Sequence, residues 1–330
     1  MIATEVKNNQ KQITNELHVI LGVNGDTGKY LVKFLVQAGY KVRGVSRSGS
    51  GPKDIETIKA NALNINELTK ALHGASVIYH CLGIPYTLWF DQHPKIMRNL
   101  IQAAAANGSQ TKIVFADNMY AYGEKGAKIG PINEETAELA TDKKGILRSE
   151  LGKMLLTASK EGLVRVSIGR ASDFFGPEAT NSIFNRFVLE NASKNKKSKM
   201  FADLDTTHSW MYLPDFARSL MTLGIQDKAD GHIWILPHFN PTTIRKFVEE
   251  FYEVNGIDIK DKVGTMPNVL LDIIGIFNKD IREYSKMSYQ RKSDWIADDT
   301  KFRETFPEWS STDLNIAFSD TFDWYKISHQ

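Results

Sequence analysis

Three glycines spaced three residues apart, Gly22, Gly25 and Gly28, follow an apolar run near the start of the chain. This spacing predicts a buried strand that ends in a tight loop and continues into a helix. Backbone amides at the start of a helix are unpaired and carry a partial positive charge, so they can bind a pyrophosphate. A second strand pattern, Tyr40–Val45, follows the predicted helix. This context favours a dinucleotide-binding loop over a glycine-rich turn without a ligand. The loop residues predicted to bind are Gly22, Asn24, Gly25, Asp26, Thr27 and Gly28.

Short apolar runs alternate with helical patterns from residue 17 to about residue 170. Strands are predicted at Leu17–Val23, Lys41–Val45, Ser76–Cys81, Lys112–Ala116 and Arg165–Gly169. Helices are predicted at Lys29–Ala38, Asn66–Leu72, Pro94–Asn107 and Leu147–Lys160. Continuous apolar strands that alternate with amphipathic helices indicate an α/β protein with a doubly wound parallel sheet, the Rossmann fold, and helices on both faces.

The alternation of short apolar runs with helical patterns ends at about residue 176, where longer segments of mixed pattern begin. We therefore expect a flexible tail over residues 1–16, a Rossmann domain over 17–176, and a smaller cap over 177–330 that is partly interleaved with the Rossmann domain. A helix is predicted at Thr242–Asn255 from its i, i+3, i+4 apolar stripe. The cap is expected over the carboxyl ends of the strands, where open α/β sheets bind their ligands.

The composition of this 330-residue chain limits the classes of partner that it is expected to bind. A net charge of +2 does not indicate a polyanionic partner, and the basic run Lys194–Lys199 is interpreted as a solvated loop rather than a nucleic-acid site. No apolar stretch is long enough to span a bilayer, and no spacing of His or Cys indicates a metal site. The one cysteine, Cys81, fits a reducing cytosol. We expect a cytoplasmic protein without nucleic-acid or membrane partners.

The end of the second strand bears on the choice of dinucleotide. NAD sites usually place Asp or Glu here to accept hydrogen bonds from the ribose 2′-hydroxyl, whereas this chain has Ser46 and Arg47. An arginine can bind a 2′-phosphate by charge-assisted hydrogen bonds, so the sequence favours NADP over NAD. The alternatives are that Arg47 stacks on the adenine or faces water.

Several further segments match one family in their order and spacing. They are Val77–Gly83, Ile113–Gly123, Ile168–Pro177, Met211–Asp215, Asp298–Lys301 and Phe322–Tyr325. With the glycine loop they resemble the extended short-chain dehydrogenases/reductases of the NAD-dependent epimerase/dehydratase family, of which this chain is an atypical example. The resemblance implies that Leu82 and Gly83 lie beside the cofactor, and that a homodimer is one arrangement to expect.

The family's chemistry depends on a Tyr-x-x-x-Lys pair, in which the lysine lowers the pKa of the tyrosine so that the phenol can exchange a proton with the substrate. By the resemblance, the tyrosine position is Lys144 and the lysine position is Arg148. No Tyr-x-x-x-Lys spacing occurs between Gly123 and Arg170. The usual proton relay is therefore altered in this chain.

The family's serine position, four residues before Tyr122, is Asn118, whose amide can donate a hydrogen bond but cannot shuttle a proton. If the chain stays extended, Asn118, Tyr120 and Tyr122 lie on one side. Tyr120 is then a candidate replacement acid, or an aromatic wall of the pocket. Arg148 could still bond the ribose hydroxyls, although a guanidinium keeps its proton.

Lys144 could donate a proton only if burial lowered its pKa, and at the start of a helix we expect it to be exposed and solvated. Further residues are expected to line a substrate pocket, each in competition with ordinary core packing. They are Tyr86, Trp89, Asp173, Phe174, His208 and Trp210. Extended members of the family bring an arginine to a nucleotide-sugar phosphate just before the Tyr212–Asp215 segment, which we interpret as a strand. No arginine lies between Arg186 and Arg218, so a smaller or less charged substrate is favoured.

Our leading hypothesis is an NADP-dependent oxidoreductase that transfers a hydride between the nicotinamide and a small carbonyl or alcohol substrate. The alternative is a dinucleotide-binding sensor or scaffold without turnover, which the missing tyrosine–lysine pair favours. Sugar epimerisation or dehydration is the third hypothesis, because both reactions need a competent proton relay.

Overall fold

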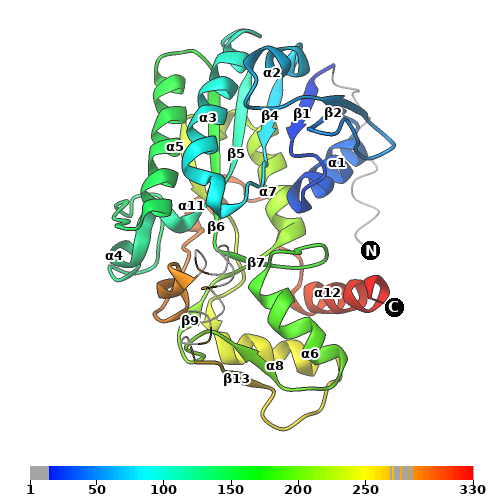
Figure 1. Cartoon of the computed structure of the whole chain (residues 1–330), viewed down its shortest axis with the longest axis vertical. Coiled ribbons are helices and arrows are strands. Elements are labelled where there is room, and N and C mark those ends of the chain that lie inside the picture. The colour runs from blue at the N-terminus through cyan, green and yellow to red at the C-terminus, as the bar shows by residue number, and fades with distance from the viewer. Residues whose placement is uncertain (1–14, 268–269, 271–275, 277–281, 283–284, 330) are drawn as a thin grey trace.

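A seven-stranded parallel sheet forms the centre of the molecule, in the order β11-β6-β5-β4-β1-β2-β3 (Figure 1). The computed structural model describes residues 15–267, 270, 276, 282 and 285–329, so most of the predicted tail lies outside the described residues. The strands are β1 (Leu17–Leu21), β2 (Lys41–Ser46), β3 (Glu56–Lys59), β4 (Val77–His80), β5 (Lys112–Asn118), β6 (Arg165–Ala171) and β11 (His232–Ile235). Strand order reverses between β1 and β4, which is where such sheets bind ligands.

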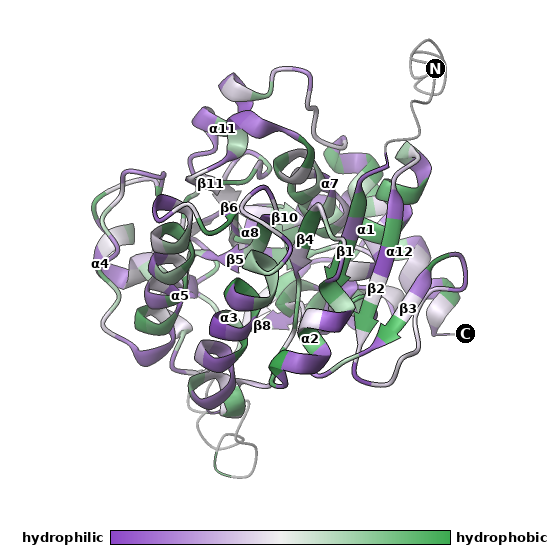
Figure 2. Ribbon diagram, turned by 90° about the horizontal axis from the view of Figure 1, so that it is seen from above, coloured by the Kyte–Doolittle hydropathy of each residue, from purple (hydrophilic) through white to green (hydrophobic). Residues whose placement is uncertain are grey.

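Helices cover both faces of the sheet, as Figure 2 shows from above. One face is covered by α2 (Ile65–Leu72), α3 (Trp89–Ala105) and α5 (Lys143–Lys160). The other is covered by α1 (Asp26–Ala38), α7 (Leu213–Ile225) and α11 (Thr300–Thr305). Each face has its own buried hydrophobic cluster, so the strands are apolar on both sides. The predicted Rossmann fold is confirmed.

The five predicted strands and four predicted helices are all present, and their bounds shift by a few residues. Two edge strands escaped prediction: β3 contains one strongly apolar residue, Ile58, and β11 lies beyond residue 176. The prediction of a strand over Tyr212–Asp215 is wrong, because α7 begins at Leu213 with Pro214 in its first turn, where proline favours a helix start.

The cap, which is the part of the molecule outside the seven-stranded sheet and its covering helices, is built on an aromatic core. Its short strands are β7 (Asp173–Phe175), β8 (Ser198–Met200), β9 (Thr207–His208), β10 (Trp210–Tyr212), β12 (Thr242–Thr243) and β13 (Val263–Thr265). Helix α8 (Ile244–Val254) forms where an amphipathic helix was predicted and buries Phe247 and Phe251 against Phe175, Phe184 and Phe318. The predicted domain boundary at residue 176 stays a prediction. Three elements that follow this residue belong with the sheet, because β11 is one of its strands and α7 and α11 pack on it.

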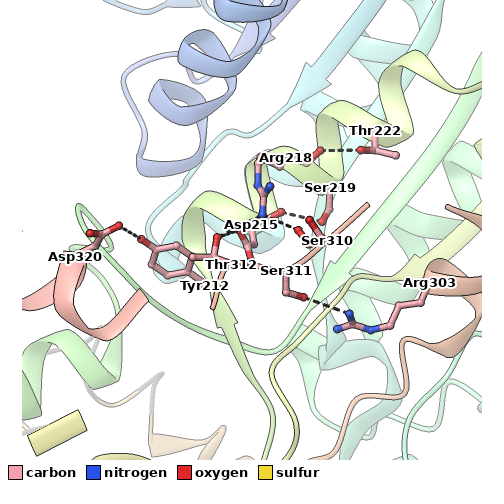
Figure 3. Close-up of polar contacts among 10 residues, drawn as sticks. All are labelled: Tyr212, Asp215, Arg218, Ser219, Thr222, Arg303, Ser310, Ser311, Thr312 and Asp320. Carbon is pink, nitrogen blue, oxygen red and sulfur yellow. Dashed lines mark hydrogen bonds and ion pairs between the residues drawn. The ribbon is translucent and has the colours of Figure 1, made fainter. Parts of the chain in front are cut away.

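A polar cluster joins the C-terminal segment to the sheet (Figure 3). Asp215, in the first turn of α7, accepts hydrogen bonds from the Thr312 amide and hydroxyl at 2.8 and 2.7 Å. Arg218 donates to Asp215 at 2.6 Å and to the Ser310 carbonyl at 2.9 Å. These bonds place the segment that leads into α12 (Leu314–Ser328), which packs on α8 in the cap.

Candidate functional site

The glycine loop joins β1 to α1 at the carboxyl end of the sheet. Gly22 has a left-handed φ of 86°, and a Cβ there would lie 2.7 Å from the Cys81 carbonyl oxygen. A Cβ on Gly28 would lie 2.4 Å from the Gly22 carbonyl oxygen, so any larger residue would push the helix away from the strand. Helix α1 has no side-chain cap at its N-terminus. The residues present therefore fit a pyrophosphate bound by the amides of the first turn.

The segment after β7 contacts the first turn of α1. Asp26 accepts hydrogen bonds from the Thr180 amide and hydroxyl, both at 3.1 Å, and Lys29 pairs with Glu178 at 2.6 Å. Burial raises the pKa of Asp26, and the Thr180 hydrogen bonds oppose that rise. Asp26, predicted to bind the cofactor, thus has a partner within the protein. No sequence pattern predicted this contact, which joins residues far apart in the chain.

The end of β2 forms a small polar loop. Ser46 donates its hydroxyl to the Ser50 carbonyl at 2.7 Å, and Asn24 of the glycine loop donates to the same carbonyl at 2.8 Å. Arg47 is exposed and has no hydrogen-bond or ion-pair partner within the described part of the chain. Its guanidinium is therefore available to a ligand phosphate. After β4, a Cβ on Gly83 would meet nothing within 4 Å, so Gly83 borders open space.

Two tyrosines and a lysine meet at the carboxyl ends of β4 and β5. The hydroxyls of Tyr86 and Tyr120 lie 3.2 Å apart, and the Trp89 ring packs against Tyr86 with ring centres 4.9 Å apart. Lys144 is 2% exposed, and its Nζ lies 4.7 Å from the centre of the Tyr86 ring. The expectation of a solvated Lys144 is wrong, because the first turn of α5 packs against the turn after β5.

The chain does not stay extended after Asn118, so the alternation expected for the tyrosines is wrong. A 3-10 turn, Met119–Tyr122, follows β5, and the Asn118 side chain accepts a hydrogen bond from the Tyr120 amide at 3.0 Å. Tyr120 faces Tyr86, whereas Tyr122 packs over the Arg170 guanidinium at 5.1 Å. The turn separates the two tyrosines into different hydrophobic clusters.

Arg148, which the sequence predicts at the family's lysine position, belongs to a buried ion network. Its Nη1 lies 3.2 Å from Oδ1 of Asp117, and its guanidinium lies 4.3 Å from the centre of the Trp89 ring. Arg170 Nε donates to Oδ2 of Asp117 at 3.0 Å, and Arg170 Nη1 pairs with Glu138 at 2.7 Å. These contacts hold Arg148 against Trp89, whose ring packs on Tyr86. The Nε of Arg148 is buried and has no hydrogen-bond partner in the described residues.

The protonation of the two pocket tyrosines is set by their surroundings. Burial raises the pKa of Tyr86, and its hydrogen bond to Tyr120 opposes that rise. Burial also raises the pKa of Tyr120 well above its usual value, and the negative charge of Asp173 adds to the rise. Both phenols therefore keep their protons at neutral pH.

Asp173 on β7 and His208 on β9 come together, with Oδ2 and Nε2 3.3 Å apart. Arg291, which sequence reasoning missed, is 2% exposed and brings a positive charge toward Asp173. Of the other predicted pocket residues, Phe174 packs on Phe216 in the sheet cluster, and Trp210 stacks on Phe247 in the cap core. The structure thus groups Tyr86, Trp89, Tyr120 and Lys144, pairs Asp173 with His208, and packs Phe174 and Trp210 in the cores.

A family model described as the NAD dependent epimerase/dehydratase family matches residues 18–236. The chain belongs to this family. Its members are enzymes, and the match spans the sheet from β1 to β11. The resemblance seen in the sequence is therefore confirmed.

Solved structures of similar fold include three sugar-nucleotide enzymes. The dTDP-glucose 4,6-dehydratase of Bacillus anthracis, in complex with NAD, has a TM-score of 0.75 at 16% identity over 95% of this chain and 97% of its own. The UDP-glucose 4-epimerase of Thermotoga maritima, with UDP-glucose, has a TM-score of 0.74 at 17% identity over 95% of this chain and 100% of its own. The UDP-glucuronic acid 4-epimerase of Bacillus cereus, in complex with NAD, has a TM-score of 0.74 at 16% identity over 95% of this chain and 97% of its own. No curated protein sequence gave a significant match.

The described residues contain no helix long and apolar enough to cross a membrane. They also contain no group of three or more acidic, histidine or cysteine side chains placed to hold a metal ion.

Proposed function

We propose that this protein binds NADP across the glycine loop and reduces a small carbonyl compound at the pocket of Tyr86, Tyr120 and Lys144. The observation that carries the proposal is the pair of protonated phenols beside a buried lysine. They lie at the carboxyl ends of the parallel strands, where the loop after β1 fits a dinucleotide. A nicotinamide bound there would supply the hydride.

The preference for NADP depends on Arg47. This guanidinium is exposed and free of partners within the described residues, and no carboxylate stands at the end of β2 to repel a 2′-phosphate. The family's description and the solved relatives name NAD, so Arg47 is the feature that separates this chain from them. Gly22, Gly25, Thr27 and Gly28 would hold the pyrophosphate, with Leu82 and Gly83 beside it.

The pocket favours carbonyl reduction over alcohol oxidation because the raised pKa values of Tyr86 and Tyr120 keep both phenols protonated. An oxygen that gains negative charge during carbonyl reduction can take a proton from Tyr120 or Tyr86 even when their pKa values are raised. Oxidation of an alcohol would need a phenolate as base, which the same surroundings disfavour. Lys144 would stabilise the developing negative charge, and Asn118 would orient the substrate oxygen.

Sugar-nucleotide epimerisation or dehydration is the second candidate, and the solved relatives favour it. They bind NAD and UDP-sugars, and Arg291 gives this chain a buried guanidinium on the cap side of the pocket. Arg291 therefore weakens the argument against a sugar-nucleotide substrate, which depended on the absence of an arginine between Arg186 and Arg218. A sensor or scaffold without turnover is the least supported hypothesis, because the family consists of enzymes.

One experiment separates the two candidates. Purified protein is incubated with NADPH or NADH and a panel of carbonyl compounds, and in parallel with oxidised dinucleotide and UDP-glucose. Oxidation of one NADPH per carbonyl reduced supports the reductase. Conversion of the sugar nucleotide without net change in the dinucleotide supports the second candidate and overturns the first. Equal or absent binding of NADPH relative to NADH would contradict the assignment of Arg47.

A further inference from the structure

The segment Pro177–Thr180, which we call the clamp segment, follows β7 and lies along the first turn of α1. The Asp26 carboxylate accepts hydrogen bonds from the amide and the hydroxyl of Thr180, both at 3.1 Å. Three residues further along α1, Lys29 pairs with Glu178 at 2.6 Å. Both contacts fall on one face of the helix, because residues three apart are neighbours on a helix surface. The clamp segment is therefore bonded to the end of α1 at which a pyrophosphate would bind.

The clamp segment is itself held in one conformation. Glu178 has a left-handed φ of 61°, which residues other than glycine rarely adopt. Its carbonyl accepts the Thr180 amide at 2.7 Å, and the Ala179 side chain between them is buried. A further bond to α1 runs from the Tyr30 hydroxyl to the Pro177 carbonyl at 3.3 Å. The backbone of the segment thus fixes the position of Thr180 opposite the helix.

The free amides of α1 lie beside the carboxylate that Thr180 binds. The Lys29 amide donates to the Gly25 carbonyl at 3.1 Å, and the amides of Asp26–Gly28 precede this bond. As at any helix start, these earlier amides have no acceptor within the helix. Such amides attract a carboxylate in the first turn. The Asp26 side chain bonds none of them in the described structure, because its hydrogen bonds go to Thr180.

A carboxylate and a pyrophosphate would compete for this end of the helix. Released from Thr180, the Asp26 carboxylate could turn to the first-turn amides, and its charge would repel the phosphates. The two donors of Thr180 satisfy the carboxylate and leave the amides open. The Lys29–Glu178 pair is too exposed to contribute much, with side chains 49% and 36% accessible. Thr180 is therefore the contact that controls where the carboxylate lies.

We propose that Thr180 is a positioning residue for dinucleotide binding, which holds the Asp26 carboxylate away from the first-turn amides of α1 so that they can bind the pyrophosphate. The inference rests on the dinucleotide-binding part of the proposed function and does not depend on the reduction step. Thr180 acts through Asp26 and does not contact the dinucleotide. NADP and NAD share the pyrophosphate, so the effect is the same for both.

The first test measures the Kd of NADPH and of NADH by fluorescence titration. Thr180→Val removes the hydroxyl but keeps the shape of the side chain and the backbone amide. We expect both dinucleotides to bind about fivefold more weakly, the effect of one lost hydrogen bond to a charged group. Thr180→Ser restores the hydroxyl and should restore the affinity. Unchanged affinity in Thr180→Val, or a loss for one dinucleotide alone, overturns the proposal.

The second test separates positioning from a structural role. In Asp26→Ala no carboxylate competes for the amides or repels the phosphates, so we expect both dinucleotides to bind roughly threefold more tightly. Adding Thr180→Val to Asp26→Ala should then change either Kd by less than about twofold, because the group that Thr180 positions is gone. Weaker binding in Asp26→Ala, or the same fivefold loss when Thr180→Val is added, overturns the proposal.

Tyr30→Phe is the matched control. It removes another bond to the clamp segment and leaves the Asp26 contact in place, so we expect both Kd values to stay within about twofold of the natural ones. A loss equal to that of Thr180→Val would mean that attachment of the whole segment sets the affinity, and would overturn the proposal. If a dinucleotide binds but no carbonyl compound is reduced, the reductase function fails and these titrations still decide the role of Thr180. Binding of neither dinucleotide overturns both.

Discussion

The two ends of the site are built on different principles. At the glycine loop, recognition depends on backbone geometry, and Gly22 and Gly28 sit where any Cβ would collide with a carbonyl oxygen. At the pocket, Lys144 and Arg148 are predicted to stand where the family pattern has tyrosine and lysine. The comparison teaches that dinucleotide binding constrains this fold through the main chain, whereas the proton chemistry lies in side chains that can be exchanged on the same scaffold.

The largest effect is expected from breaking the ion network below the pocket. Arg148→Met would remove one of the two guanidinium partners of Asp117, which is 3% exposed, and we expect the free energy of unfolding to fall by about 2–3 kcal/mol in urea denaturation. Lys95→Met removes a cation from an exposed pair with Asp91 and should change the unfolding energy by less than about 1 kcal/mol. Equal losses in the two variants would contradict the importance of burial. A selective loss of NADPH binding in Arg148→Met would instead place Arg148 on the ribose.

The next effect tests the loop end. Gly28→Ala places a Cβ 2.4 Å from the Gly22 carbonyl oxygen. We therefore expect the free energy of unfolding, measured by denaturation, to fall by about 2 kcal/mol. We also expect NADPH binding, measured by fluorescence titration, to be lost. Gly83→Ala is the matched control for stability, because its Cβ would meet nothing within 4 Å. If Gly83→Ala keeps both stability and NADPH affinity, the dinucleotide does not pass beside Gly83.

The pocket end is tested by its hydroxyls. Tyr120→Phe removes one partner of the 3.2 Å hydroxyl pair, and we expect the rate of carbonyl reduction to fall by about 10²-fold with NADPH affinity unchanged. Tyr122→Phe, two residues away in a different hydrophobic cluster, should reduce at the natural rate. Similar rates for the two variants would remove Tyr120 from the list of proton donors and sharpen the case for Tyr86.

The smallest effect is expected at Arg47. Arg47→Ala should weaken NADPH binding by about tenfold, equivalent to about 1.4 kcal/mol, and leave NADH binding unchanged, because only the 2′-phosphate would contact the guanidinium. Fluorescence titration with both dinucleotides provides the measurement. A parallel loss of NADH affinity would indicate that Arg47 stacks on the adenine instead.

Sequence reasoning succeeded where the signal is local. Apolar strands, helical stripes and the glycine spacing each depend on neighbouring residues, so the sheet from β1 to β6 and the loop after β1 could be predicted apart from the edge strand β3. It failed at Lys144, because the start of a helix is usually exposed and nothing nearby in the chain signals that the turn after β5 covers it. The helix at Leu213 was taken for a strand because its first residues are apolar.

The sequence by itself determined the fold class, the family and the loop that fits a dinucleotide, since short-range patterns and the steric demands of glycine set all three. Only the tertiary structure decided which side chains meet in the pocket. Tyr86 and Tyr120, Asp173 and His208, and Arg148 and Asp117 are pairs separated by tens of residues or more. Their contacts arise because parallel strands bring their carboxyl ends to one edge of the sheet, and no local pattern encodes which side chains then lie within hydrogen-bond distance.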